Sequence, residues 1–280
     1  MVQADPNRAT LPSSAELPCS DDIPVDNENQ NFIPNVLRFL LEFIWRDRMD
    51  WFYAVNMGVY HTTGVNPRVP IVPDAFLCLG VERRKQSLQG RGRSSYVTWE
   101  ENYIPPILTL EVVSQTYGGE YDDKMQIYAG LGVLYYVIYN PEFWRRDQHQ
   151  PFEVYKLING SYQLQIGEPL WMPEVGLGLG RFRCETAPVN QEALSWFDGA
   201  NTRYLLAEER LTQERQRAEQ ERQRAEQEQE RAEQERQRAE QERQTRLNAA
   251  SSLLSMGLSV EQVAEALSLS IDEVQSRSQS

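Results

Sequence analysis

The sequence predicts an α/β protein: a central mixed sheet flanked by helices, followed by a long charged helix and a small all-helical tail. Three observations predict this fold class. A strand, a helix and a second strand follow one another over residues 107–139, which indicates a βαβ unit with parallel strands. Residues 214–248 form five charged units of seven residues. Two capping-box patterns then precede short amphipathic segments near the C-terminus.

The elements of the α/β part follow from the spacing of apolar residues. Helical spacing predicts a helix over 32–45, and another helix of about 120–131 follows a Gly-Gly break. Asn159-Gly160 is typical of a tight hairpin turn. The expected strands cover 51–60, 69–79, 107–113, 133–139, 152–158 and 161–167.

Composition divides the chain into four regions. The first is rich in Pro, Ser, Asp and Asn and shows no periodicity, and the third is almost entirely polar. We expect an extended or disordered arm over 1–29, an α/β domain over 30–200, a charged heptad-repeat helix or coiled coil over 201–248, and a small helix-turn-helix-like tail over 249–280.

The repeat region favours reach or assembly over chemistry. Alanine recurs every seven residues at 218, 225, 232 and 239, but no second apolar position accompanies it, as a good coiled-coil seam requires. Glu and Arg pairs such as Glu219–Arg222 instead favour a solvated helix. In the tail, Ser259 with Gln262 and Ser270 with Glu273 predict helix starts, so three short helices are expected from about 249. An oligomerisation or docking cap is the alternative to a helix-turn-helix role.

Charge and composition exclude several classes. A net charge of -13 argues against a protein that coats nucleic acid non-specifically. No apolar run approaches the roughly 20 residues of a membrane span, and the first residues lack a secretory pattern. The three cysteines are too far apart for a CxxC metal site, which fits a reducing compartment. We therefore expect a cytoplasmic protein with no membrane contact.

Carboxylates carry the candidate chemistry, because phosphate-loop, nucleophile-elbow and zinc-helix motifs are all absent from the sequence. Asp74 lies in an apolar strand context after Pro73. Strand alternation places Glu111 on the face opposite Leu110. An acid in such a strand is costly unless it is paired or binds a metal, and two acids on neighbouring strands could hold one divalent cation. The alternatives are that Asp74 caps a turn and that Glu111 is an edge acid in a salt bridge.

Lys124 is one of three lysines in the chain, and it lies early in the helix expected after the Glu111 strand. Tyr128 lies one turn further on and faces the same way. A lysine beside a metal site can polarise the attacking water and stabilise charge on a phosphate. The alternative is a surface lysine paired with Glu120 or Asp123.

The order of these motifs resembles the Uma-type family of restriction endonucleases, which belongs to the PD-(D/E)XK nuclease superfamily. The resemblance covers residues 25–200. The matching segments are Pro73-Asp74, Glu111-Val112-Val113-Ser114, Lys124 with Tyr128, Gly132-Val133 through Asn140-Pro141, and Trp171-Met172-Pro173-Glu174 followed by Gly176 to Gly180.

The resemblance implies a restriction-endonuclease-like fold and Mg²⁺, or Mn²⁺, held by Asp74 and Glu111. The superfamily's usual lysine stands two residues after the second acid, where this chain has Val113. The resemblance suggests that Lys124 replaces it from the helix. Superfamily members often add an acid from the first helix region, for which Glu28 and Glu42 are candidates, with Asp26 beside them.

These observations lead to two functional hypotheses. The first is a Mg²⁺-dependent endonuclease acting on DNA, in which Asp74 and Glu111 hold the metal and Lys124 assists the attacking water. The second is a catalytically weak or inactive nuclease-fold scaffold that mediates protein–protein interaction, which the valine at position 113 favours. The resemblance to the superfamily implies a homodimer, which the alanine heptads of the helical extension permit without demanding it. A basic loop is predicted to contact the DNA backbone, and the alternative is that this loop is merely a solvated surface. Its basic residues are Arg83, Arg84, Lys85, Arg91 and Arg93.

Overall fold

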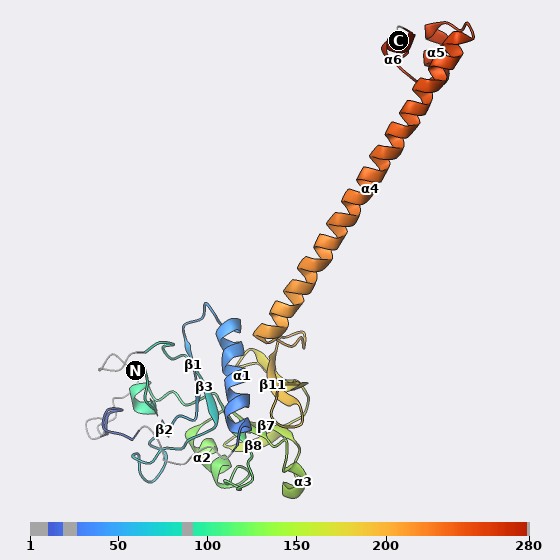
Figure 1. Cartoon of the computed structure of the whole chain (residues 1–280). Helices are drawn as coiled ribbons and strands as arrows, with labels where there is room; N and C mark the ends of the chain where they lie inside the picture. Colours follow the sequence, from blue (N-terminus) through green and yellow to red (C-terminus); the bar gives the residue numbers. More distant parts are fainter. Residues whose placement is uncertain (1–10, 19–26, 86–91, 279–280) are drawn as a thin grey trace. The chain divides into compact units, whose positions relative to one another are not determined.

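The computed structural model describes residues 11–18, 27–85 and 92–278 and divides the chain into two units, residues 1–206 and 207–280. The first unit is the predicted α/β fold (Figure 1). Its helices are α1 (Asn29–Ile44), the 3-10 helix η2 (Thr98–Glu100), α2 (Asp123–Leu131) and α3 (Trp144–Asp147). Its strands are β1 (Trp51–Val55), β2 (Val59–Tyr60), β3 (Ala75–Leu79), β4 (Tyr96–Val97), β5 (Leu108–Val112), β6 (Tyr135–Tyr139), β7 (Phe152–Ile158), β8 (Ser161–Gln165), β9 (Leu170–Met172), β10 (Leu177–Arg183) and β11 (Glu192–Phe197).

A six-stranded mixed sheet forms the centre of this unit, in the order β1-β3-β5-β6-β7-β8. Strands β5 and β6 pair in parallel, with α2 between them in the chain, so the predicted βαβ unit is confirmed. The neighbouring pairs are antiparallel, and β7 and β8 form the predicted hairpin. Asn159 and Gly160 at its turn have φ of 49° and 83°, the left-handed conformation that the tight turn requires.

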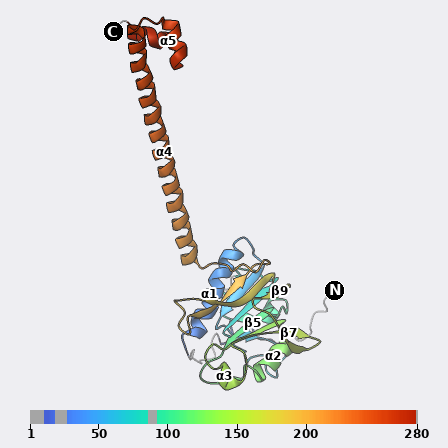
Figure 2. The ribbon, with the colours of Figure 1, turned by 90° about the vertical axis from the view of Figure 1, so that its right-hand side faces the viewer.

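The two faces of the sheet bury different side chains. Leu108 and Leu110 of β5 pack on the face covered by α1 and the small sheet β9–β11, where the Trp196 indole donates to the Leu37 carbonyl at 3.0 Å. Val113 and Tyr136 belong to the opposite core, under α2 (Figure 2). The alternation predicted for β5 is therefore confirmed, and it directs residue 111 toward the α2 face.

Two expected strands are shorter in the structure. The segment 51–60 is divided into β1 and β2 because Asn56 takes a left-handed φ of 47°, which ends the extended run. The segment 69–79 becomes regular strand only from Ala75. Pro70 and Pro73 have no backbone N–H to donate to the hydrogen-bond ladder of a sheet. The described residues before Ala75 therefore form an isolated bridge instead of a strand, between Ile71 and Val59.

Part of the expected N-terminal arm is packed rather than extended. Leu17 is 8% exposed and joins a small core with Tyr60 and Trp99. The Trp99 indole donates to the Pro12 carbonyl at 2.9 Å. Residues 11–18 of the expected extended or disordered arm thus pack against the rest of the first unit, because apolar residues within the polar segment find buried partners. Residues 1–10 and 19–26 lie outside the described residues.

The second unit contains α4 (Ala207–Ser255), α5 (Val260–Leu267) and α6 (Ile271–Ser278). Helix α4 continues through the position where a separate first tail helix was expected, and Gly257, with φ of 93°, follows its end. Ser259 and Gln262 form the predicted capping box, and Ser270 and Glu273 exchange the matching bonds. Within the described ranges, no helix is both long and apolar enough to cross a membrane.

Candidate active site

Asp74 immediately precedes β3 and is buried, with 8% exposure. Its Oδ2 accepts a hydrogen bond of 2.6 Å from the backbone N–H of Val112, on the neighbouring strand β5. Burial raises the pKa of this carboxyl well above its usual value, and the nearby Glu111 charge raises it further. The carboxylate thus bridges two strands instead of capping a local turn.

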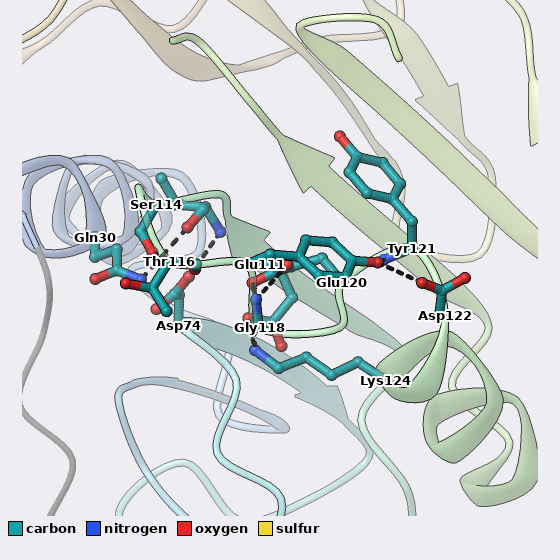
Figure 3. A network of polar contacts seen from close by, with 12 residues as sticks. Gln30, Asp74, Glu111, Ser114, Thr116, Gly118, Glu120, Tyr121, Asp122 and Lys124 are labelled. Atoms are coloured by element: carbon teal, nitrogen blue, oxygen red, sulfur yellow. Dashed lines mark hydrogen bonds and ion pairs between the residues drawn. The ribbon is translucent and has the colours of Figure 1, made fainter. Parts of the chain in front are cut away.

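Glu111 is the centre of the polar network drawn in Figure 3. Only 1% of the residue is exposed, yet both carboxylate oxygens have partners. Oε2 accepts from the Lys124 ammonium at 2.9 Å, and Oε1 accepts from the Tyr128 hydroxyl at 2.5 Å. Burial raises the pKa of Glu111 in spite of these two partners. The acid is therefore held in place by two side chains that lie one turn apart on α2.

Lys124 extends from the first turn of α2 toward Glu111, as Figure 3 shows. Its Nζ also lies 4.0 Å from Oε1 of Glu120, so the ammonium group lies between two buried acids. Burial alone would lower the pKa of Lys124, but the surrounding carboxylates outweigh it and the pKa is raised. The side chain is a charged hydrogen-bond donor at neutral pH.

Glu120 is a buried acid that sequence reasoning treated only as a partner of Lys124. It is 4% exposed, and its carboxylate accepts from the Gly118 N–H at 3.0 and 3.2 Å. A Cβ at Gly118 would lie 2.6 Å from Oε1 of Glu120, so a larger residue there would displace the end of this side chain. In the sequence, the Gly118-Gly119 pair directly before Glu120 is the feature that could have indicated a role for this acid.

Gln30 on α1 is a second residue that the sequence did not indicate. Its amide nitrogen donates to the carbonyl of Val112 at 3.4 Å, and the N–H of the same residue binds Asp74. Figure 3 shows Gln30 beside Asp74. The first helix therefore contributes a side chain to this network, as expected, but the side chain is an amide and not an acid. Glu28 is exposed and makes no side-chain cap, while Glu42 is exposed and paired with Arg83. The structure does not bring either acid to Asp74 and Glu111.

The predicted basic loop is largely engaged within the fold. Lys85 and Arg93 both bind Glu101, at 2.8 and 2.9 Å, and Arg93 also stacks on Phe52. Arg83 stacks on Trp51, in addition to its ion pair with Glu42. Arg84 is exposed, and Arg91 lies outside the described residues.

The donor set fits a hard divalent cation by charge. Asp74, Glu111 and Glu120 are buried together with one ammonium group, which leaves two negative charges uncompensated when all are ionised. No group of three or more Asp, Glu, His or Cys side chains within the described ranges is already arranged around a metal position. Glu111 is instead occupied by Lys124 and Tyr128, so metal binding requires sharing its oxygens.

Comparison with known proteins identifies the family. A family model described as Uma2, "Putative restriction endonuclease", matches residues 23–187, more than half of the chain. The chain belongs to the Uma2 family. Membership of the Uma2 family confirms the predicted resemblance and places the chain, at the level of the family, among hydrolases of the nuclease class.

One solved structure is similar in part. It is a crystal structure described as "a putative nuclease belonging to DUF820" from Anabaena variabilis ATCC 29413, with 12% sequence identity and a TM-score of 0.38. The match covers 54% of this chain and 74% of that chain. No curated protein matches the sequence.

Proposed function

We propose that the chain hydrolyses phosphodiester bonds of DNA with Mg²⁺ or Mn²⁺, using Asp74, Glu111 and Lys124. The observation that carries the proposal is the contact between Lys124 and Glu111 at 2.9 Å. It supplies from α2 the cation that Val113, the residue directly after β5, cannot supply. Family membership supports the reaction class, and the buried acids support the metal requirement.

Lys124 acts as a fixed positive charge in this proposal. Its raised pKa keeps it protonated, so it donates hydrogen bonds and does not accept a proton as a base. An ammonium group held by Glu111 orients the attacking water or stabilises the charge that develops on the phosphate. Tyr128 fixes the other oxygen of Glu111, which keeps the carboxylate aimed toward Lys124.

Asp74 and Glu111 are the proposed metal ligands, with Glu120 a third acid in the same network. A bound divalent cation would lower the pKa of water and neutralise phosphate charge. The Val112 N–H holds one oxygen of Asp74, and Gln30 in turn holds the Val112 carbonyl. These backbone contacts preset the distance between β3 and β5 at the point where the two acids lie.

The remaining parts of the proposal concern binding and assembly. Arg84 is the exposed member of the described basic loop, so it is the first candidate for a DNA backbone contact, with the paired cations contributing after rearrangement. Exposed alanines at every seventh residue of α4 are compatible with a homodimer through this helix.

The test is cleavage of supercoiled and single-stranded DNA by the full-length protein with Mg²⁺ or Mn²⁺. Glu111→Gln and Lys124→Ala should each lower the rate at least about 100-fold, since both remove groups that act on the reacting phosphate. Lys156→Ala is the matched control, because Lys156 makes a similar 2.7 Å ion pair with Glu174 outside the site.

Unchanged cleavage in Glu111→Gln and Lys124→Ala would contradict the proposal and indicate a contaminating nuclease. Absence of cleavage together with no metal-dependent rise in melting temperature would favour the scaffold alternative, in which the fold is kept without the reaction. Circular dichroism of each variant establishes that loss of activity is not loss of folding.

A further inference from the structure

A cavity of about 470 Å³ lies between the loop 61–71 and helix α2. Its volume falls within the range of small-molecule sites, about 300–1,000 Å³. The cavity is separate from the carboxylate network, although both involve α2. Its principal lining residues are His61, Val65, Asn66, Val69, Gln126 and Ile127.

His61 is the buried polar group of this cavity. It is 7% exposed, and its Nδ1 is bonded to the Thr63 hydroxyl at 2.8 Å. Burial lowers the pKa of His61, so the imidazole is neutral at physiological pH. Within the described residues Nε2 has no hydrogen-bond partner, which leaves it available to a ligand in the cavity.

The walls of the cavity are held before any ligand arrives. Ile71 and Val59 exchange two backbone hydrogen bonds, of 2.8 and 3.1 Å, which fix one end of the loop. Within the loop, Val69 N–H donates to the Asn66 carbonyl at 3.1 Å, and the Asn66 side chain accepts from Arg68 N–H at 3.0 Å. A preformed wall reduces the ordering cost of binding.

The lining chemistry suits a flat, uncharged heteroaromatic ring. Val69 and Ile127 are 60% and 40% exposed and both border the cavity, so its wall offers apolar surface to a ring. Asn66 and Gln126 add amide groups, which hydrogen-bond the edges of nucleobases. Among the six principal lining residues none carries a formal charge at neutral pH, so the cavity itself does not favour a free phosphate or a carboxylate.

We propose that this cavity binds an unstacked nucleobase of the substrate, beside the scissile phosphate; the inference rests on the proposed nuclease function. The loop ends three residues before Asp74, and Gln126 and Ile127 lie on the helix that carries Lys124. In this proposal one base of a bound strand enters the cavity while a neighbouring phosphate lies at the acids. A paired base cannot enter, so single-stranded or locally opened DNA is the preferred substrate.

The test uses single-stranded oligonucleotides with 2-aminopurine scanned through successive positions, bound to the full-length protein with Ca²⁺ in place of Mg²⁺. One position should change fluorescence on binding, and an abasic nucleotide there should weaken binding about tenfold. His61→Leu and Ile127→Ser should weaken binding of the intact strand by about the same factor. His61→Gln should restore part of it by keeping a hydrogen-bonding group.

Ile166→Ser is the matched control, because Ile166 is 95% exposed and does not line the cavity. If cleavage occurs but His61→Leu and Ile127→Ser bind like the control, the base pocket is wrong while the nuclease function stands. If the fluorescence and variant effects appear without any metal-dependent cleavage, the base pocket stands and the nuclease function fails. Equal affinity for abasic and intact strands at every position would also overturn the pocket.

Discussion

Charged residues occur in both units, but their surroundings differ completely. Most residues of helix α4 are Glu, Arg or Gln. A representative pair, Glu219–Arg222, has side chains 48% and 67% exposed. Glu111 in the first unit is 1% exposed and lies among other buried acids. Water solvates the first set at no cost, whereas the second set gives up its hydration. The same residue types therefore carry different information in the two units.

The difference in burial between the two sets of charges indicates where a charge points to function. An exposed ion pair contributes about 0–1 kcal/mol, so each pair on α4 adds little to stability. Burying Asp74 beside Glu111 is unfavourable, as the raised pKa of both carboxyls shows. A fold that keeps such a cluster gains something other than stability from it, which is why the buried site carries the functional proposal.

The largest effect on stability is expected at the Lys124–Glu111 pair. Lys124→Met should destabilise the first unit by about 3 kcal/mol, because it leaves Glu111 buried without its cation. The double variant Lys124→Met/Glu111→Gln should recover most of this loss, since both charges are then gone. Urea unfolding measures both variants. Lys156→Met is the control, and a loss as large as that of Lys124→Met would show that burial does not distinguish the two lysines.

The second effect has the opposite sign. Asp74→Asn should abolish cleavage and yet stabilise the protein at neutral pH by about 1 kcal/mol. Among the described residues Asp74 has no direct ion pair, so the substitution replaces a buried carboxyl by a neutral amide and removes the cost of burying its charge. Asn can still accept the hydrogen bond from Val112 N–H. For a unit of this size the melting temperature should rise by about 2–4 °C.

The stability difference between the wild type and Asp74→Asn should depend on pH with a defined sign. The pKa of Asp74 in the folded protein lies above the ordinary 3.8, so the folded state retains a proton that the unfolded chain has released. The wild type therefore loses stability relative to Asp74→Asn as pH rises from about 4 through the folded-state pKa. Calorimetry should show a difference that grows with pH. A constant difference, or an equal gain in Asp47→Asn at an exposed aspartate, would rule out this origin.

Much of the fold and part of the site follow from the sequence, for identifiable reasons. Strand alternation placed Glu111 on the α2 face, and helical spacing placed Tyr128 with Lys124, because both rules are local. Glu120 and Gln30 join the site through contacts that depend on how the loop before α2 and helix α1 pack, which no local rule gives. The packing of residues 11–18 escaped prediction for the same reason.

A smaller effect is expected in the second unit, where a polar side chain does have a defined partner. Ser259→Ala should destabilise the helical tail by about 1 kcal/mol, because it removes the cap of the Gln262 N–H. Loss of helical circular dichroism on heating measures the change. Ser251→Ala, inside α4, should be neutral or slightly stabilising, because alanine is the better helix former. Equal effects of the two substitutions would mean that the capping geometry contributes nothing.

The smallest effect is expected on α4 itself. Arg222→Gln removes the ion pairs with Glu219 at 3.0 Å and Glu226 at 3.7 Å. The change in unfolding free energy should stay within about 0.5 kcal/mol and disappear at high salt, because these groups are solvated. A loss above about 1 kcal/mol that depends on protein concentration would instead place Arg222 in a helix–helix interface. In that case α4 is the coiled coil of a homodimer, and its charges select a partner as well as keep the helix soluble.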